Sequence, residues 1–228
     1  MKISERQGRE IGREYALRVL KENIVMLELE PGSRISENEL AQELGVSRTP
    51  VREALIELSK GKIVEVYPQK GSYVSLIDWK LVEEAQFLRL TLERAVIRLA
   101  CQELEEDKLQ GLEKNVKLQL FYLENNEIAD LMQLDNQFHK ELFNITDKSH
   151  IYRLMSNMNL HFDRLRTLRT KAVDQRYVIE DHMNILDAIR MKNPDQGEEA
   201  IVKHLTRHEI DRNIIHRKYP QYFKEILC

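Results

Sequence analysis

The sequence has few cysteines, few aromatic residues, no excess of positive charge and no long apolar run. Its two cysteines, Cys101 and Cys228, lack the paired spacing of a disulfide framework or of a thiolate metal site. This excludes a small secreted domain held together by disulfides, and it fits the reduced cytoplasm.

The balance of charge excludes a polycation that binds nucleic acid by bulk attraction, because 35 basic and 38 acidic side chains give a formal net charge of −3. Any contact with nucleic acid must therefore be local. The opening stretch, MKISERQGREIGREY, is charged throughout and cannot form the apolar part of a secretory signal. Without an apolar run that could cross a bilayer, we expect a soluble, cytoplasmic protein with no membrane partner.

The first part of the chain has the pattern of a helix-turn-helix. Apolar residues recur at helical spacing over residues 9–27, and the sequence PGS then predicts a turn. Ser36 and Glu39 have the spacing of a capping box, so a short helix should begin there and end before Gly45. A helix, a glycine turn and a further helix make up the motif.

The only β signal in the sequence follows. The runs IVEVY and SYVSL alternate in polarity and are joined by PQKG, which predicts a hairpin, or wing. After Asp78 we expect five or six helical segments, with breaks near residues 105, 125, 146, 172 and 193. The fold class is therefore mainly α, with a winged helix-turn-helix over residues 1–76 and an all-helical antiparallel bundle over residues 77–228.

Two arginines mark the start of the third helix, which should begin at Ser47 or Thr49. Arg48 and Arg52 lie one turn apart on one face, where a helix N-terminus already favours anions. Arginine suits phosphate oxygens and the edge of guanine, so this pattern predicts a helix that reads the major groove. The alternative is a pair of solvated charges balanced by nearby glutamates.

The stretch from Pro31 to Ser75 resembles, without gaps, the winged-helix domain of the GntR family of bacterial transcription regulators, with LGVSRTPVREAL and YPQKGSYV as the most specific segments. The resemblance implies binding to double-stranded operator DNA. The residues assigned to that contact are Asn38, Ser47, Arg48, Thr49, Arg52, Lys70 and Gly71. Lys70 and Gly71 would enter the minor groove from the wing, and the role of Asn38 stays open between a phosphate contact and none.

Polar residues interrupt three apolar stripes in the second half of the sequence. Asp135 and His139 lie four residues apart in LMQLDNQFHKEL, and His182 and His204 interrupt two later stripes. A buried carboxylate is costly unless it is paired or binds metal, and imidazole with carboxylate suits zinc, nickel, copper, iron or manganese. The alternatives are hydrogen-bonded core histidines, or His208 as the inward residue instead of His204.

This half, from Val82 to Ile210, resembles the FCD effector domain of the FadR branch of the same family. Metal-binding members carry an Asp-x3-His pair and two later histidines, which implies that Asp135, His139, His182 and His204 bind a divalent ion, with zinc or nickel expected. The family also implies a homodimer, a small carboxylic acid as effector, and repression that the effector relieves. A single recognition helix reads too few base pairs to find one site in a genome, which also favours a dimer on a two-fold symmetric operator.

Arg89 interrupts the apolar stripe of the first helix in this half. It is interpreted as a partner of the effector carboxylate, or alternatively as part of an internal salt bridge, for example to Glu93. His161 is a further candidate for the wall of the effector pocket, with an ordinary core histidine as the alternative.

Two other functions are compatible with the pattern. The metal could itself be the signal, or it could be purely structural, in a DNA-binding regulator. A metal-dependent helical hydrolase is the other alternative, but such enzymes carry an adjacent His-Asp doublet, and Asp181-His182 has the reverse order. No spare general base stands beside the four ligands, so we predict no catalytic residues and no enzymatic activity.

Overall fold

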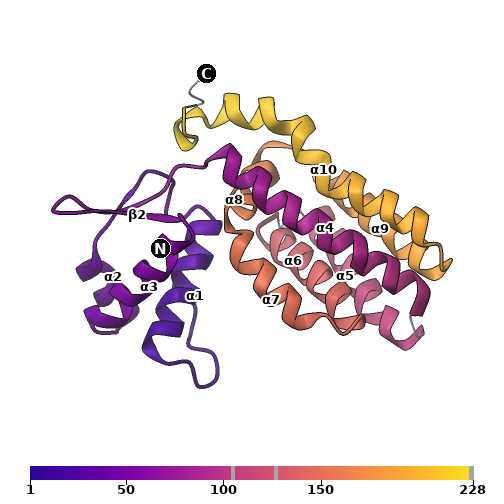
Figure 1. Cartoon of the computed structure of the whole chain (residues 1–228), viewed down its shortest axis with the longest axis horizontal. Coiled ribbons are helices and arrows are strands. Elements are labelled where there is room, and N and C mark those ends of the chain that lie inside the picture. Colours follow the sequence, from indigo (N-terminus) through magenta and orange to yellow (C-terminus); the bar gives the residue numbers. More distant parts are fainter. Residues whose placement is uncertain (104–105, 126–127, 226–228) are drawn as a thin grey trace. The chain divides into compact units, whose positions relative to one another are not determined.

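The computed structural model describes residues 1–103, 106–125 and 128–225 (Figure 1). It has two compact units, the N-terminal unit and the helical unit. The N-terminal unit comprises Met1–Val82, Leu160–Thr167 and Tyr219–Cys228, and the helical unit comprises Glu83–Asn159 and Leu168–Lys218. The predicted break near residue 105, and Cys228, lie outside the described residues.

The N-terminal unit contains the predicted helix-turn-helix, formed by α2 (Glu37–Leu44) and α3 (Arg48–Lys60), with α1 (Gly12–Val25) before it. At the start of α2 the Ser36 hydroxyl accepts a hydrogen bond from the Glu39 backbone amide at 3.4 Å. The helix ends at Gly45, whose φ of 64° is a left-handed conformation that glycine adopts without strain. These two residues mark the two ends of α2, and Gly45 begins the turn that leads to α3.

A small antiparallel sheet follows, with the strand order β1 (Arg34–Ile35), β3 (Gly71–Val74), β2 (Val64–Tyr67). The hairpin β2–β3 is the predicted wing, with Val64 opposite Val74 and Tyr67 opposite Gly71. The strand β1 was not predicted, because two residues are too few to show an alternating pattern. It pairs with β3 and places Arg34 opposite Tyr73.

The core of the N-terminal unit is apolar and lies between its helices and sheet. It is formed by buried residues of α1, α2 and α3 with residues of the strands and Leu160, among them Val19, Leu20, Ile24, Leu40, Leu44, Val51, Leu55, Leu58 and Val74. Val51, Leu55 and Leu58 are therefore inward, as the sequence pattern predicts, and the opposite face of α3 stays exposed.

The helical unit is built from α4 (Trp79–Glu103), α5 (Glu106–Glu124), α6 (Ile128–Ile145), α7 (Ser149–Met158), α8 (Leu160–Ala172), α9 (Arg176–Arg190) and α10 (Pro194–Lys218). The first turn of α4, up to Val82, and the larger part of α8, Leu160–Thr167, belong to the N-terminal unit. None of the helices in the described part of the chain is long and apolar enough to span a membrane.

The described residues after Asp78 form seven α-helices, so the prediction of five or six was wrong. The missed boundary is at Asn159, between α7 and α8, where the backbone stays close to helical values (φ −75°, ψ −7°). No glycine or proline marks it, so the sequence carries no breaking signal there. The start of α10 was predicted correctly, with the Asn193 side chain accepting from the Gln196 amide at 3.2 Å.

Candidate nucleic-acid interface and metal centre

The exposed N-terminal end of α3 carries the predicted DNA-contact residues. The side chains of Arg48 and Arg52 are 65% and 70% exposed, and Ser47 and Thr49 beside them are exposed too. Both guanidinium groups lie near one carboxylate, that of Glu37, with nitrogen to oxygen distances of 3.5 and 3.6 Å. Such long, exposed ion pairs are weak and compete poorly with a phosphate.

A hollow of about 610 Å³ in the N-terminal unit brings several of these residues together. It is lined by Arg34, Ile35, Ser36, Glu37, Asn38, Glu39, Arg48, Arg52, Gly71 and Ser72. The DNA-contact predictions Asn38, Arg48, Arg52 and Gly71 therefore share one concave surface at the start of α2. Ser47, Thr49 and Lys70 do not line it.

The tip of the wing is shaped by two residues with left-handed backbone, Gln69 (φ 64°) and Gly71 (φ 104°). Lys70 between them is exposed, and its amide closes the turn on the Tyr67 carbonyl at 3.1 Å. Arg34 was missed as a member of this surface, because the strand that carries it leaves no signal in the sequence. A Cβ at Gly71 would lie 3.5 Å from Nε of Arg34, so wing and β1 are adjacent.

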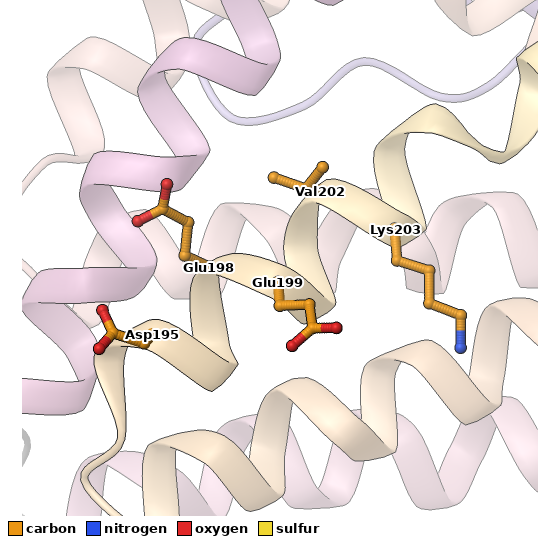
Figure 2. Close-up of a pocket in the computed structure, with 5 residues that line it drawn as sticks. All are labelled: Asp195, Glu198, Glu199, Val202 and Lys203. Carbon is orange, nitrogen blue, oxygen red and sulfur yellow. The ribbon is translucent and has the colours of Figure 1, made fainter.

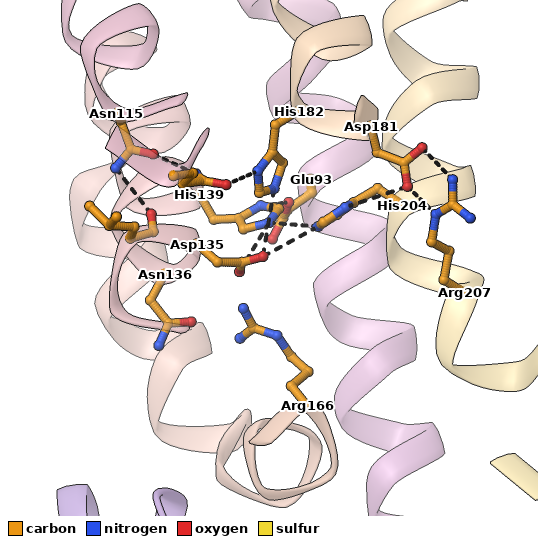
Figure 3. Close-up of polar contacts among 12 residues, drawn as sticks. Glu93, Asn115, Asp135, Asn136, His139, Arg166, Asp181, His182, His204 and Arg207 are labelled. Carbon is orange, nitrogen blue, oxygen red and sulfur yellow. Dashed lines mark hydrogen bonds and ion pairs between the residues drawn. The ribbon is translucent and has the colours of Figure 1, made fainter. Parts of the chain in front are cut away.

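In the helical unit the four predicted metal ligands converge (Figure 3). Asp135 and His139 come from α6, His182 from α9 and His204 from α10, and one possible ligand atom from each lies within 4.8 Å of the others. Their exposed fractions run from 0% to 9%. Among the described residues this is the one group of at least three His, Cys, Asp or Glu with such geometry.

The three imidazoles all direct Nε2 toward the carboxylate of Asp135. The distances from Nε2 to an Asp135 oxygen are 3.7 Å for His139, 3.6 Å for His182 and 4.0 Å for His204. The ring of Phe138 stacks on His182 at 4.2 Å between centroids, which fixes the plane of that imidazole. The side chain of His208, the alternative to His204, lies outside the described residues.

These donors fit a divalent transition metal. Burial is the main cause that lowers the pKa of His139, and the charge of Arg89 lowers it further, so this imidazole is neutral and can offer a lone pair. Three neutral imidazole nitrogens and one carboxylate oxygen are typical ligands of zinc and nickel. Four protein ligands leave coordination positions open where the metal prefers more than four.

Each histidine also meets a polar side chain through Nδ1, the ring nitrogen that is not directed toward Asp135. Nδ1 of His139 lies 2.5 Å from a Glu93 oxygen, and Nδ1 of His182 lies 2.8 Å from Gln119 Oε1. Nδ1 of His204 is 3.9 Å from Asp181 Oδ2. Glu93, Gln119 and Asp181 were not predicted as partners of these histidines, because the contacts depend on packing between helices that are distant in the sequence.

Arg89 is buried, and its Nε donates to Glu93 Oε1 at 2.6 Å. This is the internal salt bridge that the sequence left as the alternative to an effector contact. Burial alone would raise the pKa of Glu93, but the charge of Arg89 and the hydrogen bonds donated by Arg89 and His139 outweigh it and keep the pKa below its usual value. Glu93 is therefore a buried, ionised carboxylate, with one oxygen bonded to Arg89 and the other to His139.

His161 belongs to the N-terminal unit and is not brought together with the four ligands. Its Nε2 lies 2.9 Å from the Gly61 carbonyl, and its Nδ1 lies 2.9 Å from an Arg164 nitrogen. Because a carbonyl only accepts and a guanidinium only donates, the ring is neutral with its proton on Nε2. Arg164 is fully buried and also donates to the Ser75 carbonyl at 2.6 Å.

A second hollow, of about 560 Å³, lies on α10 and contains no predicted site residue (Figure 2). It is lined by Asp195, Glu198, Glu199, Val202 and Lys203. Two of its carboxylates, those of Asp195 and Glu198, are engaged by Arg98 of α4 at 2.8 Å. An acidic surface whose charges are paired in this way gives no support to a further metal or anion site.

Comparisons with known proteins agree with both units. Residues 14–74 match the family model "Bacterial regulatory proteins, gntR family", and residues 84–207 match the model "FCD domain". The HTH-type transcriptional repressor RspR of Escherichia coli (strain K12) is 31% identical over 211 residues, which is 91% of this chain and 92% of that protein.

The gluconate operon transcriptional repressor of Bacillus subtilis (strain 168) is 28% identical, over 76% of this chain and 74% of that protein. Among solved structures, Escherichia coli McbR/YncC has the same fold, with a TM-score of 0.79 at 20% identity, over 92% of this chain and 99% of that one. The chain belongs to the GntR family of bacterial regulatory proteins with an FCD domain, and it is a DNA-binding transcription regulator and not an enzyme.

Proposed function

We propose that the protein is a cytoplasmic, homodimeric repressor that binds a two-fold symmetric operator and responds to a small carboxylic acid through a metal-assisted pocket. The observation that carries the proposal is the convergence of three Nε2 atoms and one carboxylate in a chain that also has a winged helix-turn-helix. RspR and the gluconate operon protein are both named repressors, which supports repression as the mode of action.

On the DNA side, Arg48 and Arg52 would exchange Glu37 for operator phosphates or guanine edges, with Asn38, Ser47 and Thr49 beside them. Lys70 and Gly71 would reach the minor groove, since glycine permits close approach of backbone to the duplex. One such surface reads a half-site, and a dimer would present two of them to a symmetric operator.

On the effector side, Asp135, His139, His182 and His204 would hold zinc or nickel. The bound metal would supply positive charge and open coordination positions, which a carboxylate can occupy. Arg89 is engaged by Glu93, so an acid that used it as a second anchor would have to displace that carboxylate. His161 would reach the effector only by giving up its bonds to Gly61 and Arg164.

The test combines metal analysis with ligand screening. Protein purified without a metal-affinity tag is analysed for its elements, and small carboxylic acids are screened by thermal shift before and after chelation. Near-stoichiometric metal, with an acid that stabilises only the metallated form, supports the proposal. Absence of metal, with no effect of chelation, would leave the four residues as core polar groups and the signal unidentified.

A second experiment separates an acid sensor from a regulator in which the metal is itself the signal or purely structural. Operator duplexes are selected from a random-sequence library, and their affinity is measured as metal is titrated. An acid sensor releases the operator when the acid is added at constant metal. Release or tightening by metal alone would favour the metal as the signal.

A further inference from the structure

The polar side chains behind His139 and His182 determine which ring nitrogen of each histidine carries the proton. This matters because a neutral imidazole can ligate a metal only through the nitrogen that has no proton. The residues concerned come from α4 and α5, two helices that supply none of the four ligands.

For His182 the direction of every bond follows from a backbone carbonyl. The carbonyl of Leu134 only accepts, so the Asn115 amide nitrogen donates to it at 3.0 Å. The Asn115 oxygen then accepts from Gln119 Nε2 at 2.6 Å, which turns Gln119 Oε1 toward His182. At 2.8 Å that oxygen accepts from Nδ1, so Nδ1 carries the proton and Nε2 keeps its lone pair.

For His139 the same result follows from the two contacts of Glu93. Glu93 is completely buried, and Arg89 donates to its Oε1 at 2.6 Å. Because a carboxylate that is paired with a guanidinium accepts and does not donate, the contact of 2.5 Å to Oε2 requires a proton on Nδ1 of His139. Its Nε2 lone pair also faces Asp135.

His204 is held differently. Its Nε2 lies 3.0 Å from Nε2 of His139, which has the lone pair, so His204 is the donor in that contact. To ligate a metal, His204 must carry its proton on Nδ1 instead. Asp181 lies 3.9 Å from that nitrogen, and a small rotation of the ring would let it accept a hydrogen bond from Nδ1–H. Arg207 holds Asp181 in place with two hydrogen bonds.

We propose that Glu93, held by Arg89, and Gln119, held by Asn115, are positioning residues that set His139 and His182 as ligands before the metal arrives, whereas His204 changes its tautomer when the metal binds. This inference rests on the proposed metal centre, but its first part concerns the metal-free chain. Arg89 is then a support of the ligand shell and not the effector's anchor.

The first experiment uses the metal-free full-length protein with ¹⁵N-labelled histidines. Long-range ¹H–¹⁵N spectra distinguish the two neutral tautomers, and single histidine variants assign the signals. We expect Nδ1–H for His139 and His182 and Nε2–H for His204. Nε2–H at His139 and His182 in the wild type would overturn the inference, whether or not the chain binds metal.

The second experiment uses two variants, Glu93→Gln and Gln119→Leu. A glutamine at position 93 can turn its NH2 group toward Nδ1 and favour the wrong tautomer, and leucine at position 119 removes the acceptor. Competition with a chelator should show zinc and nickel affinity falling by about 10- to 100-fold in each variant, the usual effect of losing an outer partner of a ligating histidine. Gln119→Glu keeps an acceptor and should retain the Nδ1–H tautomer of His182.

Glu84→Gln and Gln110→Leu are the matched controls, since both residues lie on exposed faces of the same two helices. Circular dichroism checks that each variant is folded. Unchanged tautomers and unchanged metal affinity in Glu93→Gln and Gln119→Leu would overturn the role of these residues. A wild type that binds no metal would instead contradict the proposed function. The spectra of the metal-free chain would still show which tautomer each histidine adopts.

Discussion

The proposed DNA-contact arginines and the proposed metal-ligating histidines are held in opposite ways. Arg48 and Arg52 are more than half exposed and share one carboxylate in long ion pairs, whereas the three histidines are at most 9% exposed and Nδ1 of each meets a polar side chain. An exposed pair adds little to the stability of the fold, but a buried polar cluster is part of the core. Function and stability should therefore separate in the N-terminal unit and be coupled in the helical unit.

The largest effect is expected from removing two ligands together, with His182→Ala and His204→Ala in one chain. Two protein ligands are too few for a stable site, so metal content should fall from about one equivalent to none, as measured by elemental analysis. The variant should also lose stabilisation by metal, which amounts to about 2.7 kcal/mol at a free metal concentration 100 times the Kd.

His150→Ala is the control for this double variant, because His150 is exposed on α7 and forms a local hydrogen bond with Arg153. Its metal content and its response to chelation should match those of the wild type. Unchanged metal content in the double variant would show that the ion binds elsewhere.

Arg48→Ala and Arg52→Ala test the exposed side of the comparison. Loss of a good contact to a base costs about 1–3 kcal/mol of binding, so operator affinity should fall by roughly 5- to 150-fold. The free energy of unfolding should change by less than about 0.5 kcal/mol, because the pairs with Glu37 are long and exposed. Fluorescence anisotropy and urea unfolding measure the two quantities.

Arg13→Ala provides the matched control, since Arg13 is half exposed on α1 and makes a similar pair with Glu57 at 3.5 Å. It does not line the hollow that gathers Arg48 and Arg52. Equal losses of affinity in all three variants would mean that the arginines act by general charge and not by placement.

The sequence predicted the N-terminal unit well where the signal is local. The capping box at Ser36, the left-handed Gly45 and the wing each depend on a few adjacent residues, so short sequence motifs are enough to predict them. What it missed there is β1, whose two residues become a strand only by pairing with β3, almost forty positions away. The same pairing places Arg34 in the hollow that four of the proposed DNA-contact residues line.

In the helical unit the inward direction of the four ligands was predictable, because a polar residue in an apolar stripe must face the interior. Their partners were not. Glu93 and His139 are 46 positions apart, and Gln119 and His182 are 63 apart, so only the packing of whole helices brings them together. For Arg89 the sequence offered a salt bridge to Glu93 or an effector contact, and the structure has the salt bridge.

Packing inside the helical unit can be tested without touching a ligand, through Gly197 of α10. A Cβ there would lie 2.9 Å from Cys101 Sγ and 3.1 Å from Ile97 Cγ1, and both side chains are completely buried. Gly197→Ala should therefore destabilise the chain by roughly 1–3 kcal/mol, although alanine is the better helix former. Urea unfolding measures the change.

Gly111→Ala on α5 is the control, because its nearest contact would be the flexible end of Glu141 at 3.4 Å. There alanine's helix propensity should dominate, and stability should rise by up to about 1 kcal/mol. A stabilised Gly197→Ala variant would mean that α4 and α10 are packed less closely than the structure has them.

The smallest effect concerns the pH dependence of stability at His161, the buried histidine of the N-terminal unit that was predicted as an effector contact. Burial, followed by the charge of Arg164, lowers its pKa from 6.5 to about 4, and protonation of Nδ1 would place an N–H against the guanidinium. Between these two pH values the unfolded chain binds the extra proton and the folded chain does not. The stability that the neutral ring contributes is therefore complete above pH 6.5 and is lost as the pH falls toward 4.

His161→Gln should remove this pH dependence, since the amide can donate to the Gly61 carbonyl and accept from Arg164 as the neutral ring does. Between pH 7 and 4.5 the wild type should lose roughly 2–2.5 kcal/mol more of its unfolding free energy than the variant, because each of the two pH units below 6.5 corresponds to about 1.36 kcal/mol. Contributions from other groups, including the nearby Asp78 and Lys224, cancel in this difference. A variant as acid-sensitive as the wild type would mean that His161 is protonated without cost in the folded chain. A histidine in the solvent-facing wall of an effector pocket could be protonated in this way. A buried histidine that is hydrogen-bonded to Gly61 at the end of α3 could not.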